Sequence, residues 1–389
     1  MREKIKIRLS VVVVGVVFTT ALLLMARHLV GLVAVEGPRT DLDIVIQAAA
    51  RFLSHEPVYR LDDPFEHTKP PLLMGLVFWL PWVPHFWVRL AWDCVVFVMP
   101  FLILREGVLA GWVARPRWGE LSLPLAWVVM YPFWYKEAGD CQYNLFIFWL
   151  ILVSARWLRS SVKALQPGAG ALTAVALVLK PTQVFLVPWI VFGAIRAGAK
   201  KQLLWFAAGA LALLLALAGV FIFLSSPSEL WSSHLEWFEF MRHSTLKHLM
   251  GSNNYGLPTL LARMGLGEGG VSPLFTLLGL TVVSVLAGWK SKNRVSSLEW
   301  SVWVMLAFSP MSWISNFGVF LFLALDLSRL SRSLQLGLLG LICLFLVSRT
   351  SEHWLGPVGM EAWGRLAAPL WLTALALVCR GWGRGGIQV

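Results

Sequence analysis

The sequence predicts an all-helical protein, a polytopic transmembrane bundle of about 12 membrane segments. Of its 389 residues 58% are apolar, including 22 Trp and 23 Phe, and only 14% are charged. Soluble domains are usually about 25% charged. Apolar runs at 9–26, 203–224 and 334–347 approach or reach the length that crosses a bilayer. These runs do not alternate between apolar and polar residues, which argues against a β-barrel.

Twelve runs are assigned as membrane segments, at 9–34, 86–104, 121–135, 143–158, 168–180, 182–195, 202–224, 273–289, 297–311, 313–327, 334–348 and 362–380. The first begins with a basic stretch, as a signal peptide does. It continues well past Ala26 without a small-residue cleavage site, so we expect an uncleaved helix. An even number of crossings places both termini on the same side of the membrane.

The charges orient this topology. With the N-terminus inside, the inner loops hold 20 of the 33 basic residues and five of the 21 acidic ones, so they sum to +15 and the rest to −3. Cytoplasmic loops of membrane proteins carry such an excess of Lys and Arg. The net charge of +12 therefore comes from small clusters between apolar runs, and we expect no nucleic-acid partner.

The apolar stretch Pro71–Trp82 is interpreted as a re-entrant or interfacial helix. Counting it as a crossing would place the later basic clusters outside. It belongs to the first extracytoplasmic loop, 36–85, and a second such loop spans 225–272. No soluble catalytic domain is evident, so we treat 1–389 as one integral membrane domain.

This topology gathers most of the unusual polar motifs on the outer face, where we expect one polar cavity. The motifs are Thr40-Asp41-Leu42-Asp43, Gly139-Asp140-Cys141-Gln142-Tyr143-Asn144, Lys180-Pro181-Thr182-Gln183, Gly251-Ser252-Asn253-Asn254 and Ser309-Pro310-Met311-Ser312-Trp313.

Asp41 and Asp43 begin an amphipathic stretch that ends near Leu53. Acids in a first helical turn favour the helix dipole, so either one could serve only as a cap. Residues two apart diverge by about 200° on a helix, so the two carboxylates cannot share one task. One could act as a general base while the other caps the helix. Lys180, at the end of an apolar run, either snorkels to the surface or supplies a point charge for a phosphate.

A metal site is not expected. His243 and His248 are five residues apart, which does not fit the helical spacing of a zinc site. The aromatic residues around His234 and His243 favour an amphipathic helix on the bilayer. No cofactor is expected either, because the chain has no Gly-rich nucleotide loop.

The stretch from Asp41 to Pro81 resembles the start of GT-C membrane glycosyltransferases, and most closely glycosyltransferase family 87, the polyprenol-phosphate-mannose-dependent mannosyltransferases. The features that carry the resemblance are Asp41, Ala48-Ala49, Tyr59 and Lys69-Pro70-Pro71. Gly139–Asn144 is similar to the family's Gly-Gln-x-Asn element with two extra residues, and Lys180-Pro181 to its Lys-Pro turn. Asn253 to Arg263 and Ser309 to Trp313 are similar to two later elements. The family often has His shortly after that Trp, where this chain has Ile314-Ser315-Asn316.

The resemblance implies transfer of a hexose, mannose by the family, from a polyprenyl-phosphate-sugar donor to a glycolipid or glycan acceptor. The reaction takes place at the extracytoplasmic face of the inner (plasma) membrane, with inversion. Asp41 is the expected general base on the acceptor hydroxyl, with Asp43 behind it. Lys180 and Arg263 are candidates to stabilise the departing phosphate. Gln142, Asn144, Asn253, Trp313 and Asn316 are candidates for sugar, acceptor or donor contacts.

Three alternatives remain open. A transporter or flippase of lipid-linked sugars would also have many segments, although it would more often show two related halves. A polymerase of the O-antigen type would need a more basic second outer loop. An inactive family member would fit the replacement of the usual His by Asn316.

Overall fold

The computed structural model describes residues 40–62, 66–110 and 139–249, the short helix 301–306, and the isolated residues 134, 137, 282, 298 and 319. Within these residues all regular secondary structure is helical. The elements are α2 (Asp41–Leu53), η1 (Pro71–Leu73), α3 (Met74–Val77), η2 (Leu80–Trp82), α4 (His85–Leu109), α6 (Asn144–Leu158), α7 (Leu165–Leu179), η3 (Pro181–Leu186), α8 (Val187–Arg196), α9 (Gln202–Leu224) and α10 (Pro227–Leu249).

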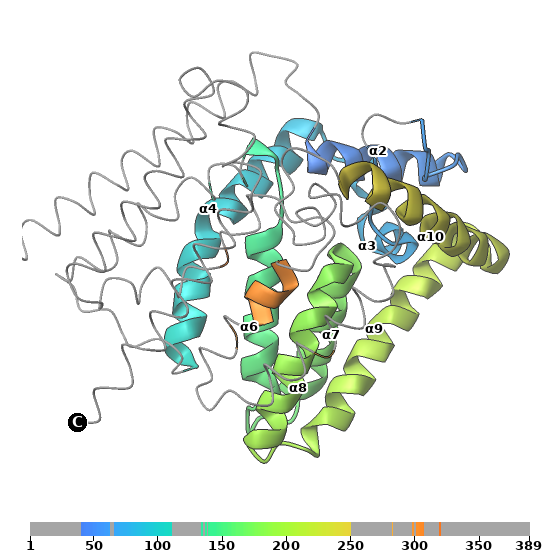
Figure 1. Ribbon diagram of the computed structural model, residues 1–389. Helices are drawn as coiled ribbons and strands as arrows, with labels where there is room; N and C mark the ends of the chain where they lie inside the picture. The colour runs from blue at the N-terminus through green and yellow to red at the C-terminus, as the bar shows by residue number, and fades with distance from the viewer. Residues whose placement is uncertain are drawn as a thin grey trace, which may run out of the picture.

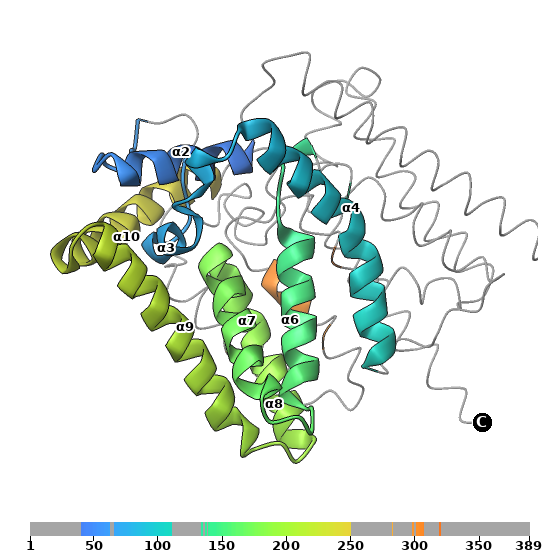
Figure 2. The same ribbon diagram turned by 180° about the vertical axis from the view of Figure 1, so that it is seen from behind.

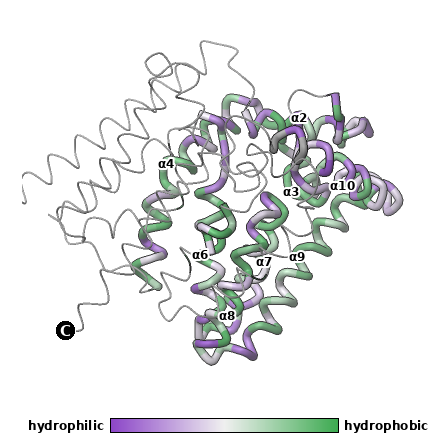
Figure 3. The backbone as a smooth tube through the Cα atoms, in the orientation of Figure 1, coloured by the Kyte–Doolittle hydropathy of each residue, from purple (hydrophilic) through white to green (hydrophobic). Residues whose placement is uncertain are grey.

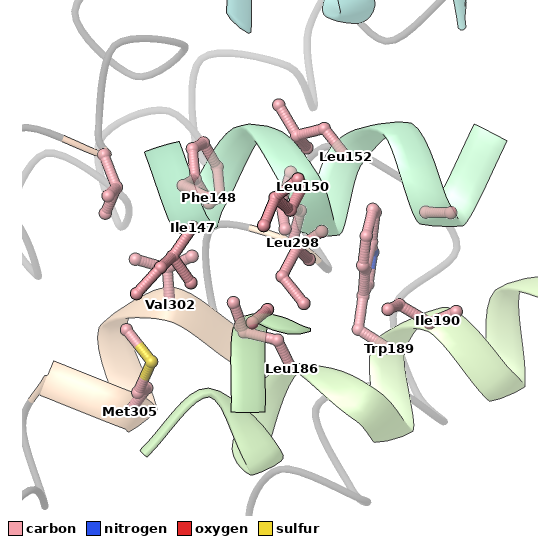
Figure 4. Packing of buried hydrophobic residues seen from close by; sticks show 14 of the residues in the cluster. Ile147, Phe148, Leu150, Leu152, Leu186, Trp189, Ile190, Leu298, Val302 and Met305 are labelled. Carbon is pink, nitrogen blue, oxygen red and sulfur yellow. The ribbon is translucent and has the colours of Figure 1, made fainter. Parts of the chain in front are cut away.

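The long helices form one bundle. α7 packs against both α6 and α9, and α4 packs against the other side of α6 (Figure 1). Figure 4 shows the centre of this bundle, where Ile147 and Phe148 of α6 face Leu186 and Trp189. Val302 and its neighbours from the later part of the chain fill the same core. The bundle therefore joins segments that lie far apart in the sequence.

Glycines allow α7 and α9 to approach closely. A Cβ atom on Gly170 would lie 1.8 Å from the carbonyl oxygen of Phe206, and one on Gly209 would lie 2.0 Å from that of Pro167. Both distances are far inside van der Waals contact, so only glycine fits at these two crossing points. Small residues at helix crossings are typical of membrane bundles, where backbones pack closely.

Three elements gather at one end of the bundle. α2, α3 and α10 lie together there in both Figure 1 and Figure 2, above the upper ends of α6, α7 and α9. Their contacts form a second core, in which the Phe52 ring of α2 lies 4.5 Å from the Phe221 ring of α9. Gly75 permits the close approach of α3 to the backbone of α9 at Leu217. This end of the molecule is the expected outer face.

The other end carries basic turns. The turn between α6 and α7 contains Arg159 and Lys163, and the turn between α8 and α9 contains Lys200 and Lys201. Arg156 near the end of α6 donates a hydrogen bond of 2.5 Å to Glu106 of α4. These basic turns therefore lie at the end of the bundle opposite α2, α3 and α10.

Among the helices that the structure describes, α4 and α9 are long and apolar enough to cross a membrane. α9 is hydrophobic over nearly its whole length (Figure 3), yet only 17% of its most apolar window is buried. Its exposed side chains include Leu204, Leu211, Leu215 and Phe223. An apolar helix with so little burial inside the protein is suited to contact with lipid.

Five of the 12 predicted membrane segments correspond to described helices: α4, α6, α7, α8 with η3, and α9. The other seven fall wholly or mainly outside the described residues. The predicted helix at Pro71–Trp82 is confirmed as a short apolar helical stretch, and it consists of η1, α3 and η2 in succession. Pro71 and Pro81 stand in the two 3₁₀ turns, where a missing N–H is tolerated better than inside a continuous α-helix.

Candidate active site

The site is built around the N-terminus of α2. Thr40 caps this helix in a reciprocal capping box: the Asp43 N–H donates to Thr40 Oγ1, and Asp43 Oδ2 accepts from the Thr40 N–H at 2.7 Å and from the Thr40 hydroxyl at 2.8 Å. The other carboxylate oxygen of Asp43 pairs with His85, the first residue of α4. These contacts fix the start of α2 against the start of α4.

Asp43 therefore performs the capping role that the sequence left open for one of the two acids. Partial burial raises the pKa of Asp43, but the hydrogen bonds from Thr40 and His85 outweigh it, and the pKa lies below its ordinary value. One carboxylate oxygen of Asp43 accepts from Thr40 and the other pairs with His85. Asp43 therefore holds the start of α2, and with it Asp41, in position.

Asp41 is the first residue of α2, and its N–H donates a hydrogen bond of 3.1 Å to the Asp140 carbonyl. The side chain of Asp41 lies within electrostatic reach of Lys69 and Lys180. The first loop, the 139–144 segment and the turn after α7 therefore come near one another at the start of α2. This arrangement brings together three of the five motifs that the sequence placed on the outer face.

The two extra residues after Gly139 form a tight turn. Cys141 has a φ of +49°, in the left-handed region, and the Gln142 N–H donates to the Glu137 carbonyl at 2.9 Å. This bond and this conformation are those of a Schellman helix end, with Cys141 at the position usually taken by Gly. The turn directs the chain into α6, which begins at Asn144.

Three predicted site residues form one hydrogen-bonded chain. The Lys180 ammonium donates to Asn144 Oδ1 at 2.5 Å, and Asn144 Nδ2 donates to Gln142 Oε1 at 2.8 Å. Gln142 and Asn144 are both buried. Lys180 has an extended backbone just after α7, because the following Pro181 disfavours a helical conformation. This conformation ends α7 at the level of the Asn144 side chain.

Glu137 is a buried carboxyl that the sequence analysis missed. Its Oε1 atom accepts a hydrogen bond of 2.7 Å from the Leu145 N–H, at the start of α6. Burial raises the pKa of Glu137 to about 8, although the Leu145 N–H and Lys180 act against that shift. At neutral pH the carboxyl is mostly protonated and does not cancel the charge of Lys180.

Lys69 precedes the Pro70-Pro71 turn, and the sequence predicts no role for it in the site. Its ammonium lies 5.4 Å from the centre of the Tyr143 ring and 3.3 Å from the Thr68 hydroxyl. The Tyr59 hydroxyl donates to the Lys69 carbonyl at 2.8 Å, which holds the turn. Burial works against the charge of Lys69, but Tyr143 and Asp41 outweigh it and raise the pKa, so this lysine is a cation.

The structure thus brings Asp41, Asn144 and Lys180 near one another and places Lys69 and Glu137 beside them. His85 was also missed, because nothing in the sequence pairs a residue of α4 with Asp43. The predicted contributors Arg263, Asn253, Trp313 and Asn316 lie outside the described residues. Among the residues that the structure does describe, no group of three or more His, Cys, Asp or Glu side chains is placed to hold a metal ion.

No known protein family, curated protein or solved structure matches this chain.

Proposed function

We propose that this chain is a multi-pass membrane glycosyltransferase of GT-C type, resembling glycosyltransferase family 87. It transfers a hexose, mannose by that resemblance, from a polyprenyl-phosphate-sugar to an acceptor hydroxyl at the extracytoplasmic face of the plasma membrane. The observation that carries the proposal is that the start of α2, the hydrogen-bonded Lys180 and Asn144, and Lys69 lie near one another, so that one carboxyl group, that of Asp41, interacts electrostatically with two lysines.

The chemistry of such a transfer needs both kinds of group. The acceptor oxygen forms a bond to the anomeric carbon, and the bond from that carbon to the phosphate oxygen breaks. The acceptor proton goes to Asp41, which must come within about 2.6–3.2 Å of the hydroxyl. The bonding electrons leave with the phosphate, whose negative charge increases by one. Fixed cations at that position stabilise the developing charge.

Lys180 is suited to the phosphate because Asn144 holds its ammonium in place. Lys69 supplies a second positive charge, which also interacts electrostatically with Asp41. Asn144 and Gln142 form a polar wall beside Lys180 that is suited to hydroxyl groups of a sugar. Asp43 positions Asp41 through the capping box and is not assigned to the reaction itself.

Membrane location is supported by the two long apolar helices and by the basic turns at the end opposite the site. A lipid-linked donor fits a site at a membrane surface, since its phosphate lies at the headgroup level and its chain lies in the bilayer. The full set of 12 segments, and the contributions of Arg263, Asn253, Trp313 and Asn316, belong to this proposal.

The test is sugar transfer by the purified protein in liposomes. Radiolabelled polyprenyl-phosphate-mannose is the donor, and native membrane lipid extract supplies the acceptor. We expect transfer by the wild type and by Asp62→Asn, which alters an exposed carboxylate in the same loop. We expect loss of transfer, with the fold intact, in Asp41→Asn. Normal transfer by Asp41→Asn would rule out this carboxylate as the base.

A wild type that transfers nothing would be tested for donor binding. Binding that is lost in Lys180→Ala but retained in Asp41→Asn would preserve the assignment of a lipid-phosphate site and direct the search to another acceptor. Movement of the intact lipid-linked sugar across the bilayer, without transfer, would instead establish the flippase alternative.

A further inference from the structure

α10 has two faces of opposite character. Trp231, Leu235 and Phe238 are 69%, 54% and 63% exposed. Their spacing of four and three residues places them on one face of the helix, as expected from 3.6 residues per turn. Three large apolar side chains in a row on an exposed helix face indicate that an apolar partner covers this face.

The opposite face of α10 is attached to the segment that leads to Lys69. The indole N–H of Trp237 donates to the Thr68 carbonyl at 3.2 Å. The buried Phe240 ring lies 5.8 Å from the Tyr59 ring, and Tyr59 in turn donates its hydroxyl hydrogen bond to Lys69. These contacts join α10 directly to the turn that carries the Lys69 ammonium.

Glu66 completes the attachment. Its carboxylate accepts hydrogen bonds from the Ser244 hydroxyl and, at 2.6 Å, from the Lys247 ammonium. The Glu66 side chain is only 6% exposed, so this pair is more shielded from water than a surface ion pair. Glu66 is three residues before Lys69. Next to it His67 is buried, 5.8 Å from Tyr59.

The position of α10 directly after α9 indicates what covers the exposed face formed by Trp231, Leu235 and Phe238. α10 follows α9 after a turn at Ser225 and Ser226, and the last turn of α9 exposes Ile222 and Phe223. The apolar surface of α10 therefore begins where that of a helix long enough to cross a membrane ends. Mixed aromatic and polar residues at such a place are characteristic of the interface between lipid chains and headgroups.

We infer that α10 is a two-sided strap. Its Trp231, Leu235 and Phe238 face rests in the headgroup region of a phospholipid bilayer, and its opposite face holds the 66–69 turn through Glu66 and Thr68. Contact with lipid keeps α10 in place and so fixes the position of Lys69. A strap of this kind makes the geometry of the site depend on the surrounding bilayer. The surface and the attachment do not depend on the proposed activity.

The lipid contact is tested by spin labels placed singly at positions 231, 235 and 238, in nanodiscs of phosphatidylethanolamine and phosphatidylglycerol. Matched labels at 239 and 243 lie on a polar, exposed side of the same helix. The four native cysteines are first replaced. We expect the first set to collide more with oxygen than with a water-soluble nickel chelate, and the second set to show the reverse. A preference for the nickel chelate at 231, 235 and 238 would overturn the inference.

The attachment is tested by hydrogen exchange in the same nanodiscs. We expect the double variant Leu235→Ser with Phe238→Ser, and separately Glu66→Gln, to speed exchange in the 66–69 turn by about tenfold, because charge-assisted hydrogen bonds there are weakened. Glu239→Gln, a polar change on an exposed part of α10, is the control and should leave exchange unchanged. Equal protection of this turn in all three variants and the wild type would refute the coupling. Neither measurement requires sugar transfer.

Discussion

Replacing Gly209 with alanine tests the contact that holds α7 beside α9. The added Cβ would lie 2.0 Å from the Pro167 carbonyl oxygen and 2.5 Å from its carbonyl carbon. Both neighbours are backbone atoms, so no side chain can rotate away, and the helices themselves must separate. Overpacking of this kind costs about 1–3 kcal/mol.

The same helix offers a matched control. A Cβ on Gly219 would meet nothing within 4 Å, so Gly219→Ala adds a methyl group in open space. Alanine is better than glycine in a helix interior by about 0.8–1.0 kcal/mol, and we expect this variant to be as stable as the wild type or more so. The two substitutions are chemically identical, so the gain in helix propensity cancels between them, and their difference of about 1–3 kcal/mol isolates the helix contact.

The assay is the midpoint of thermal unfolding in detergent, followed by the loss of helical circular dichroism. We expect Gly209→Ala to unfold several degrees below the wild type and Gly219→Ala at or above it. Because α7 ends at Lys180, separation of α7 from α9 in Gly209→Ala should also displace Lys180 and reduce sugar transfer in the liposome assay. Equal midpoints for the two variants would show that α7 and α9 do not cross at this glycine.

Three further predictions concern the site. Glu137→Gln imitates the protonated carboxyl: the wild type should lose stability as pH rises from its ordinary pKa of 4.5 through about 8, and the variant should not, as measured by unfolding midpoints at pH 5 and pH 8.5. Cys141→Gly removes the strain of a left-handed residue and should stabilise the fold by about 1 kcal/mol, whereas Cys141→Val should destabilise it in the same melts. Asp43→Ala removes the cap on Thr40 and should cost about 0.5–2 kcal/mol at pH 7. Because the pKa of Asp43 is depressed, that difference should persist above its ordinary value of 3.8 and disappear as pH falls below it.

The sequence predicted the helices best where one physical signal dominates. α9 matches the predicted segment 202–224 at both ends, because its apolar run is uninterrupted and bounded by Lys201 and Ser225. α2 was also predicted, since Asp41 and Asp43 begin an amphipathic stretch that ends near Leu53 and acids favour the first turn of a helix. The stretch Pro71–Trp82 was harder, because its composition does not reveal that Gly75 presses against α9 and that its prolines favour separate turns.

The sequence predicted several residues of the candidate site, but it did not predict the contacts between them. Charge topology placed Asp41, Asn144 and Lys180 on one face, but the hydrogen bond between Lys180 and Asn144 joins residues 36 apart and leaves no local signal. Glu137 was overlooked because a lone acid beside an apolar run resembles a helix end. Its burial follows from the packing of α6, which sequence periodicity does not specify.

The charges around Lys180 provide a reason for an anionic ligand at this site. Lys180 interacts electrostatically with one other cation, Lys69, and with two carboxyl groups, those of Asp41 and Glu137. If both carboxyls were ionised, the four groups would be neutral as a set. Because burial raises the pKa of Glu137 to about 8, this carboxyl contributes little negative charge at neutral pH, and the two lysines then outnumber the one remaining carboxyl group, that of Asp41. A shielded excess charge is costly unless an anion offsets it, so a phosphate that binds beside Lys69 and Lys180 would stabilise the site. A neutral sugar alone would not provide that compensation, which favours a lipid-linked phosphate donor over a free sugar as the ligand.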